Sequence, residues 1–219
     1  MKKSKAETAK TRQRIVEVAS EAFRNQGIDA TGVAEIMAAA GLTHGGFYRH
    51  FDSKEELVRE AIALSRRDYF AETLSAAEQG AEALMKHFQE YVTPDYRDDI
   101  GGGCPLAANG SEIVRTDAKT RHNATEALRI WFGKTAPYMR AQDDDGKAEM
   151  AISVVTNMIG ALTMSRIVDD PVLSDQILAA TRKRIANAFD LSSSKRGDDS
   201  PTPARAPKPR EKPAKSKKQ

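Results

Sequence analysis

The sequence predicts an all-α protein, and three observations lead to that prediction. Alanine, arginine, lysine and glutamate are frequent in a chain of 219 residues that is 40% apolar and 30% charged. Apolar residues recur at spacings of three and four, the period of a helix packed on one face. No stretch alternates apolar and polar residues long enough to indicate a sheet. The length suits a small domain followed by a larger one, each with its own core.

The first predicted helix comes from apolar residues near the N-terminus. Ile15, Ala19, Ala22 and Phe23 recur at helical spacing, and Gly27 ends the helix. The basic start, MKKSKAETAKTRQR, continues into this helix without the apolar core of a signal peptide. A single Cys leaves no internal disulfide framework. Both features favour the cytoplasm.

Residues 31–56, TGVAEIMAAAGLTHGGFYRHFDSKEE, predict a helix-turn-helix. Thr31 is expected to cap the first helix with its hydroxyl, and Gly41 supplies the left-handed geometry of a sharp turn. Thr43 then caps the second helix. The buried face of the first helix would consist of Val33, Ile36 and Met37.

The second helix of this pair is too rich in glycine to be chosen for helix stability alone. Gly45 and Gly46 lie side by side in the run from His44 to Phe51. We therefore expect another molecule to come close to the backbone there.

The rest of the chain reads as helices with recognisable breaks. Asp52 or Ser53 would cap a long helix, Pro105 suits a first helical position, and Pro137 would bend or end a later helix. A loop is expected over residues 95–103. The predicted helices span about residues 53–74, 81–92, 105–116, 117–140, 150–168 and 171–189.

The helix-turn-helix block resembles the DNA-binding signature of the TetR family of transcriptional repressors. In that signature a turn Gly is followed by Ser or Thr, a Gly, a Tyr, a His-Phe pair and Ser-Lys-Glu. The matching residues here are Gly41, Thr43, Gly45, Tyr48, His50, Phe51 and residues 53–55. The resemblance covers about the first 60 residues. It implies a three-helix DNA-binding domain in 1–52, a helical ligand-binding and dimerisation domain in 53–191, and about nine helices in all.

The resemblance also implies a set of DNA contacts. Tyr48 and His50 are similar to family positions that meet phosphates, and Lys54 to a lysine that pairs with the DNA backbone. The alternative for His50 is a role as a hydrogen-bonded core residue. His44 would reach a base edge, and Arg49 either bases or phosphates. The full predicted set is Thr31, Thr43, His44, Gly45, Tyr48, Arg49, His50 and Lys54.

Charge is distributed unevenly along the chain. Residues 1–54 carry nine Lys or Arg against six acidic residues, and residues 61–191 carry 15 against 19. A basic module on an acidic body suits a protein that presents one face to phosphates. No cofactor and no metal are expected, since His44 and His50 lie on different helix faces. The longest uncharged run, residues 150–165, is too short to span a bilayer, so no membrane partner is expected.

The last two helices are predicted to pair with a second copy of the chain. Their wide apolar stripes either face the domain's own core or form a four-helix bundle with the twofold mate, as in similar repressors. A homodimer would read a palindromic double-stranded operator, which one helix-turn-helix is too small to specify. The predicted interface residues are Ala151, Val154, Val155, Met158, Leu162, Ile177, Thr181 and Ile185.

Cys104, in the sequence GGGCPLAANG, stands at the head of a predicted helix. A thiol in this position can have a lowered pKa and act as a sensor, as in similar electrophile-responsive members of the family. Alternatively, it is a small apolar packing residue. Family resemblance further implies an unknown small-molecule effector in the larger domain. The expected wall residues are Phe88, Tyr91, Cys104, Leu106, Trp131, Phe132 and Met158.

The C-terminal segment, residues 192–219, is rich in Pro, Lys and Arg and has no large apolar residue, which predicts disorder. The function indicated is a ligand-responsive repressor at the nucleoid. The alternatives are a DNA-organising protein on the same fold, or an enzyme built on Cys104, His122 and Asp117. The enzyme is disfavoured because no nucleophile motif or phosphate loop surrounds these residues.

Overall fold

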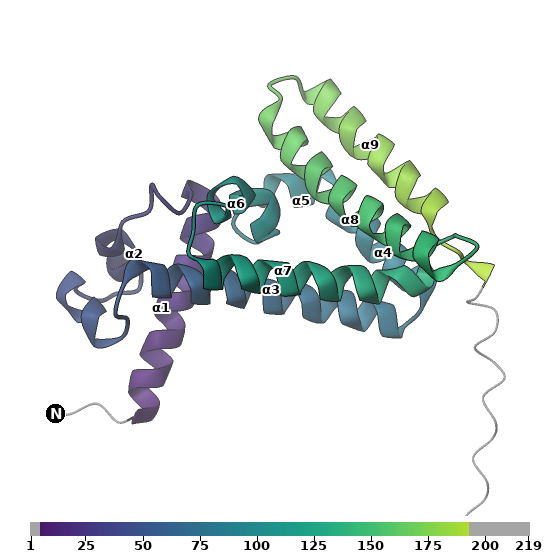
Figure 1. Ribbon diagram of the computed structural model, residues 1–219. Coiled ribbons are helices and arrows are strands. Elements are labelled where there is room, and N and C mark those ends of the chain that lie inside the picture. Colours follow the sequence, from purple (N-terminus) through teal and green to yellow (C-terminus); the bar gives the residue numbers. More distant parts are fainter. Residues whose placement is uncertain (1–4, 193–219) are drawn as a thin grey trace, which may run out of the picture.

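The computed structural model describes residues 5–192, apart from the side chains of residues 66, 68 and 69. Within that part, the chain forms nine α-helices and two short 3₁₀ helices, and its extended pairing is limited to one isolated bridge between Met139 and Phe189. Figure 1 shows a small N-terminal module at one end of a larger helical body. The all-α prediction is confirmed. The predicted tail lies outside the described residues from residue 193 onward.

The N-terminal module consists of α1 (Lys5–Gln26), α2 (Val33–Ala39) and η1 (His44–Arg49). Gly27 ends α1 at φ +91°, a left-handed conformation that glycine adopts without steric cost. One apolar core holds the three helices together and also includes residues of α3. Its largest members are Ile15, Phe23, Ile36, Met37, Phe47, Phe51 and Leu57.

Helix α3 (Lys54–Glu78) joins the module to the body. Ser53 caps it, because its hydroxyl accepts a hydrogen bond from the Glu56 amide at 3.2 Å. Arg12 of α1 forms ion pairs with Glu56 and Glu60 of α3 at 2.6 Å each. Its guanidinium also lies 4.1 Å from the centre of the Phe51 ring. These contacts fix the direction in which α3 leaves the module.

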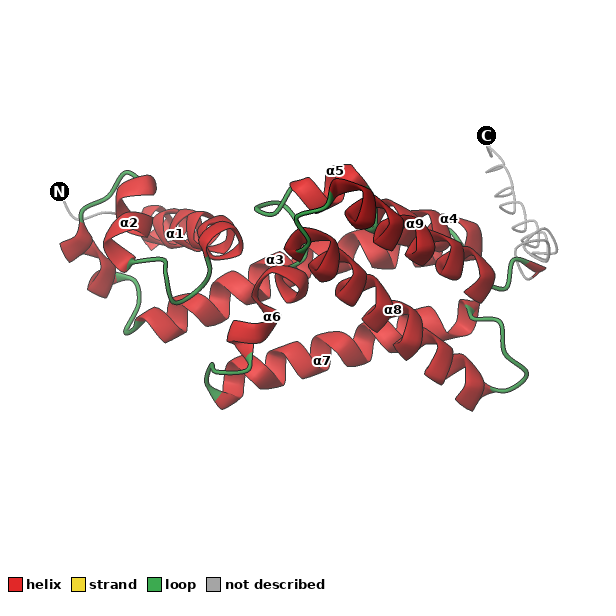
Figure 2. Cartoon of the chain, turned by 90° about the horizontal axis from the view of Figure 1, so that it is seen from above, coloured by secondary structure: helices red, strands yellow, loops and turns green. Residues whose placement is uncertain are grey.

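The body is a bundle of helices around a second apolar core. The bundle contains α4 (Ala81–Tyr91), α5 (Pro94–Asp98), α6 (Pro105–Ile113), α7 (Ala118–Thr135), η2 (Ala136–Tyr138), α8 (Asp144–Ile167) and α9 (Pro171–Ala188). Seen from above, α8 and α9 run next to each other as a hairpin across the body (Figure 2). The hairpin leaves one of its faces open.

Several predicted boundaries differ from the structure for local reasons. Helix α5 lies inside the expected loop, because Thr93 caps it and Pro94 occupies a first-turn position. Helix α8 begins six residues before Met150, because Asp143 caps it and accepts from the Gly146 amide at 2.8 Å. Such aspartates favour a helix start through both the cap and the helix dipole.

The caps of the helix-turn-helix also differ from prediction. Gly32, and not Thr31, is the N-cap of α2, and neither it nor Thr43 at the head of η1 makes a side-chain capping bond. The second helix is a 3₁₀ helix of six residues, as its two glycines would favour.

Helix α8 is long and apolar enough to cross a bilayer by length and composition, with a hydropathy of 1.3 over its most apolar window. Core helices of soluble proteins meet the same criterion. One face of α8 is packed in the core of the body, and its other face carries Ser153, Thr156 and Asn157.

Candidate nucleic-acid interface

A tight turn sets the angle between the two helices of the helix-turn-helix. Gly41 adopts φ +68° and donates its amide to the Ala38 carbonyl at 2.9 Å, while the Leu42 amide donates to the Met37 carbonyl at 2.8 Å. This pattern satisfies the last carbonyls of α2 and stops the helix. The turn at Gly41 is therefore confirmed in the form that the sequence predicts.

Aromatic packing determines which side of η1 faces outward. Phe47 and Phe51 are 1% exposed, and their rings stack with centres 5.5 Å apart. Tyr48 lies edge-on to Phe47 but is 70% exposed. The ring of Tyr48 and its hydroxyl are therefore accessible to another molecule.

Most of the predicted DNA-contacting residues lie on one exposed surface, which we call the η1 face. Its members are Thr43, His44, Gly45, Tyr48 and Arg49, all of them exposed. A Cβ added at Gly45 would meet nothing within 4 Å, so this chain itself does not require glycine there. The absence of a side chain matters only to a molecule that approaches from outside.

Three predicted contacts lie elsewhere. Thr31 is fully buried, and its hydroxyl donates to the Gly27 carbonyl at 2.6 Å, so it holds the loop between α1 and α2 and is not a surface contact. His50 is half-buried beside the core, in line with its alternative role. Lys54 is half-buried at the start of α3, with Nζ 3.5 Å from the Asp29 carbonyl.

Sequence reasoning missed the residues that tie the module to α6. The Glu112 carboxylate of α6 accepts from the Ile28 amide at 2.7 Å and from the Asp29 amide at 3.1 Å. Asn109, also of α6, donates to the Phe23 carbonyl at 2.7 Å. These bonds join residues more than 80 positions apart, and no local pattern marks them. Helix α6 therefore holds the end of α1 directly.

The predicted ligand-binding residues are packed against one another. Phe88, Tyr91, Cys104, Trp131 and Met158 are at most 2% exposed and belong to the core of the body, with Leu106 and Phe132 against its edge. The Trp131 ring contacts those of Phe88 and Tyr91, with centres 6.2 Å apart in each case. The apolar cavity beside Cys104, Leu106 and Trp131 measures about 20 Å³, enough for one water molecule. In this conformation, these residues provide no room for an effector.

Cys104 does not have the exposure expected of a sensor. The residue is 2% exposed. Burial raises the pKa of its thiol, and hydrogen bonds from Tyr91 and from the backbone of Ala107 and Leu106 offset only part of that rise. The thiolate is therefore disfavoured, which argues against the sensor alternative and favours the packing alternative for Cys104. Desolvation outweighs the position at a helix N-terminus.

The predicted dimer stripe mostly faces inward. Ala151, Val154, Val155, Met158, Leu162 and Ile185 are at most 7% exposed and lie in the core of the body. Their side chains are taken up by the chain's own core, so this part of the predicted interface is corrected. Apolar residues occur on both sides of α8, and periodicity does not tell which side is inside. Ile177 and Thr181 line a shallow groove on the opposite, open face of the hairpin.

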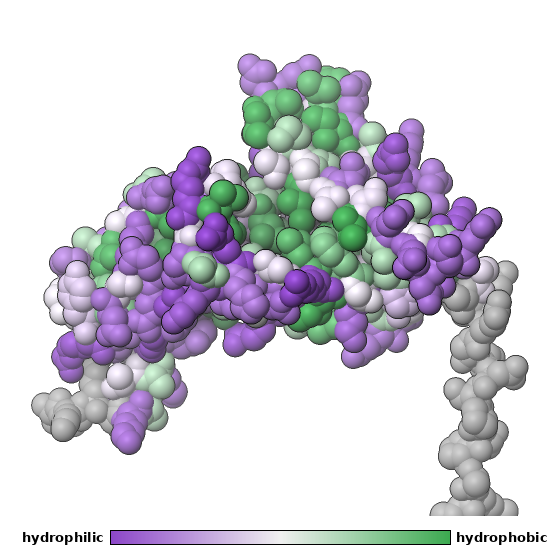
Figure 3. All heavy atoms as spheres, in the orientation of Figure 1, coloured by the Kyte–Doolittle hydropathy of each residue, from purple (hydrophilic) through white to green (hydrophobic). Residues whose placement is uncertain are grey.

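The open face of the α8–α9 hairpin is the second candidate surface. Small residues line its groove, including Gly160, Ala161 and Ala180. Large apolar side chains continue beyond the groove toward the α8–α9 turn, where Figure 3 shows apolar spheres gathered at the tip. Those side chains are Met164, Ile167, Val172 and Leu173, which are 44–67% exposed.

Two residues of the enzyme alternative are already buried or engaged in other contacts. Cys104 is buried, and Asp117 both caps α7 and pairs with Arg59 at 2.8 Å. Across residues 5–192, no three His, Cys, Asp or Glu residues are grouped so that they could hold a metal ion.

A helix-turn-helix module attached to a larger helical body is the architecture of helix-turn-helix regulators, and this chain has that architecture. Residues 15–61 match the sequence model of the bacterial regulatory proteins of the tetR family. The matched domain, together with the relatives and solved structures below, supports a transcriptional regulator of the TetR family. Proteins of this family are transcriptional regulators and not enzymes.

Individual relatives agree with this assignment. The HTH-type transcriptional regulator AcrR of Shigella flexneri is 44% identical over 64 residues, which are 29% of this chain and 30% of that protein. The HTH-type transcriptional repressor KstR2 of Rhodococcus jostii is 28% identical over 127 residues, 56% of this chain and 62% of that protein. The matches thus span less than two thirds of these curated relatives.

Solved structures confirm the fold over a longer range. A TetR family regulator from Cytophaga hutchinsonii superposes with a TM-score of 0.70 at 21% identity, covering 85% of this chain and 98% of that one. The reduced form of NemR from E. coli gives a TM-score of 0.66 at 16% identity, covering 83% and 97%. The body therefore has a TetR-like fold although its sequence has diverged.

Proposed function

We propose that the chain is a homodimeric transcriptional repressor that binds a palindromic DNA operator in the cytoplasm and is released by a small molecule. The observation that carries this proposal is the η1 face, an open surface at the head of a helix-turn-helix. Relatives with repressor names support the same function.

The η1 face has the chemistry of a major-groove surface. Gly45 leaves space for a phosphate or base edge against the backbone, and Tyr48 presents a hydroxyl that can donate to a phosphate oxygen. Arg49 adds a positive charge, and His44 offers a donor or acceptor to a base edge. Arg14 of α1 reaches the turn, with a guanidinium nitrogen 3.5 Å from where a Cβ at Gly41 would lie, and extends the positive surface.

Dimerisation through the open face of the α8–α9 hairpin would bring two such faces together. Gly160, Ala161 and Ala180 allow close approach of helices, and the exposed apolar residues near the turn favour burial. Two modules related by a twofold axis would read two half-sites of a palindrome. In this proposal the dimer interface consists of the residues of the groove, and the inward-facing residues of the predicted stripe are not part of it.

A route for release by an effector is the attachment of α6 to the module. Glu112 and Asn109 hold the end of α1, so a shift of α6 would move the module relative to the body. An effector can cause this shift only if it binds the protein more tightly with α6 in one position than in the other.

The test is DNA binding by paired variants at several salt concentrations. We expect Tyr48→Phe to weaken binding to every duplex similarly and by the same factor at each salt concentration, because the lost hydroxyl is neutral and releases no counterion. We expect Gly45→Leu to abolish operator binding in a folded protein, because the side chain would fill the space where the duplex approaches. Wild-type affinity in both variants would refute the η1 face as the interface. Mapping bound sites across a genome separates a repressor, with few palindromic sites, from a DNA-organising protein, with many scattered sites.

A further inference from the structure

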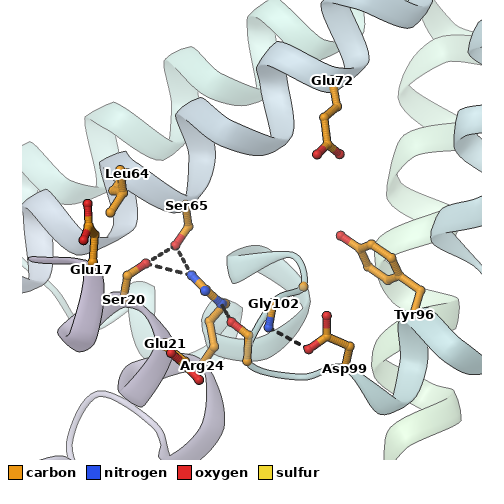
Figure 4. Close-up of a pocket in the computed structure, with 12 residues that line it drawn as sticks. Glu17, Ser20, Glu21, Arg24, Leu64, Ser65, Glu72, Tyr96, Asp99 and Gly102 are labelled. Atoms are coloured by element: carbon orange, nitrogen blue, oxygen red, sulfur yellow. Dashed lines mark hydrogen bonds between the residues drawn. The ribbon is translucent and has the colours of Figure 1, made fainter. Parts of the chain in front are cut away.

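A cleft of about 620 Å³ lies between the DNA-binding module and the body. Helix α1 forms one wall, α3 a second, and Tyr96 with the loop of residues 99–103 the third (Figure 4). The volume is within the range of small-molecule sites, which often lie between domains. None of the residues predicted to bind a ligand lines this cleft.

Arg24 of α1 crosses the inner end of the cleft. Its guanidinium donates to the Ser20 hydroxyl at 2.7 Å, to the Ser65 hydroxyl of α3 and to the Gly101 carbonyl. All three acceptors are neutral oxygens. The module, α3 and the loop that leads into α6 are therefore joined through one side chain.

The lining of the cleft has an excess of negative charge. Four carboxylates, those of Glu17, Glu21, Glu72 and Asp99, line the cleft together with one described cation, Arg24. A second cation, Arg166, lies behind the third wall, with a guanidinium nitrogen 3.3 Å from where a Cβ at Gly103 would lie. Among the described side chains, Glu72 and Asp99 form no ion pair, and the bond that Asp99 makes is with the Gly102 amide at 2.9 Å. Carboxylates without a cation attract positive charge into a concave site.

Tyr96 supplies an aromatic and hydrogen-bonding wall. Figure 4 shows its hydroxyl and the Glu72 carboxylate pointing toward the same open space. Burial, with a further contribution from Glu72 and Asp99, raises the pKa of Tyr96, so its hydroxyl stays protonated at neutral pH. Its oxygen can accept a hydrogen bond from a donor cation, and its ring can pack against the carbon body of a ligand.

The glycines of the loop keep the third wall free of side chains. A Cβ at Gly101 would lie 2.5 Å from Asn25 Nδ2, and one at Gly103 would lie 2.8 Å from the Asp99 carbonyl. Gly103 thus requires glycine, because the atom that a Cβ would meet is backbone, whereas at Gly101 the end of the Asn25 side chain could move aside. The glycines therefore place bare backbone beside the carboxylates.

We propose that this junction cleft binds an organic cation, an ammonium-bearing small molecule whose charged group lies between Glu72, Asp99 and Tyr96. An ammonium group donates three hydrogen bonds, which suits two carboxylates and a hydroxyl oxygen. A bare metal ion is a poor fit, because no three His, Cys, Asp or Glu residues in the described chain converge on one point. A bound molecule would touch α1 and the loop before α6 together.

The test measures binding of 2-phenylethylammonium to the full chain by calorimetry. Its matched control is 2-phenylethanol, which has the same body without the charge. We expect the amine to bind at least about tenfold more tightly than the alcohol. Equal affinities, or no saturable binding of the amine up to about 10 mM, would overturn the proposal.

Variants of the cleft locate the binding. We expect Glu72→Gln and Asp99→Asn each to weaken amine binding about tenfold and to leave alcohol binding unchanged, since both keep the size of the side chain. Glu78→Gln, an exposed residue of the same helix outside the cleft, is the control and should bind as wild type. Wild-type amine affinity in both cleft variants would place the amine elsewhere and refute the site.

Only the regulatory meaning of the cleft rests on the proposed function. Calorimetry uses no DNA, so the two proposals can fail separately. If the protein binds the amine but no operator, the cleft proposal stands and the repressor proposal is refuted. If the protein binds an operator but not the amine, the cleft proposal is refuted and the repressor proposal stands. Where both bindings occur, the amine is expected to change operator affinity, and the same change should be reduced in Glu72→Gln.

Discussion

Replacing Glu112 with Ala is expected to loosen the attachment of the DNA-binding module to α6. The carboxylate accepts from the Ile28 amide at 2.7 Å, the Asp29 amide at 3.1 Å and Asn109 Nδ2 at 3.0 Å. In the variant, the exposed Asp29 amide can donate its hydrogen bond to water, and Asn109 keeps its bond to the Phe23 carbonyl. The main loss is therefore the acceptor for the amide of Ile28, a residue that is 5% exposed.

The magnitude follows from that one bond. A hydrogen bond to a charged acceptor contributes about 1.5–3 kcal/mol, and water will replace part of it, so we expect a loss of about 2 kcal/mol in the free energy of unfolding. For a chain of this size, that loss lowers Tm by roughly 4–8 °C. Glu112→Gln keeps one oxygen acceptor for Ile28 and should lose about half as much.

Urea denaturation followed by circular dichroism measures the effect. Glu149→Ala serves as the control, because Glu149 is an exposed residue of α8, and its replacement should change stability by less than about 0.5 kcal/mol. If Glu112→Ala is as stable as that control, the bonds from α6 do not hold the module, and the proposed route from body to DNA fails.

Three further predictions follow from the described contacts. Met164→Glu, on the open face of the hairpin, should give a folded monomer by light scattering. Val155→Glu should instead unfold the body, since an unpaired buried carboxylate costs several kcal/mol. A stable, dimeric Val155→Glu protein would contradict the inward orientation of Val155. Alkylation of Cys104 should be slow in the native protein and fast in denaturant, and a native rate equal to that of a free thiol would show that the residue is exposed. Hydrogen bonding to the Asp52 amide and to Arg12 lowers the pKa of Glu56 from its ordinary value of 4.5, so its stabilisation is present above pH 4.5 and is lost as the pH falls through the lower folded value. Unfolding free energies measured across that range should therefore depend less on pH in Glu56→Gln than in wild type, and identical pH dependences would contradict the assignment.

Local sequence features predicted the parts of the fold that local physics controls. Gly41 needs a left-handed backbone, Ser53 caps a helix, and Pro105 begins one, and each effect acts within a few residues. The exposed part of the η1 face was also accessible from sequence. Phe47 and Phe51 are spaced to pack inward, which leaves Tyr48 outside.

The errors arise where the outcome depends on what packs against a residue. Val155 and Met158 are apolar at helical spacing, but only the tertiary structure shows that α8 turns them toward the core. Cys104 lies at a helix N-terminus, yet burial dominates its pKa. Arg24 and Glu112 make their bonds across long separations in sequence, so no motif identifies the junction between module and body.

Helix α3 has a mechanical consequence for reading DNA. Its 25 residues form a rod of about 37 Å at 1.5 Å per residue. Because Arg12 fixes the module to one end of that rod, a tilt imposed at the other end is carried to the module undiminished. A tilt of about 5° displaces the far end of such a rod by roughly 3 Å, close to the spacing of about 3.4 Å between successive base pairs. In the proposed homodimer, small movements in the body would therefore shift one recognition surface out of register with the next half-site.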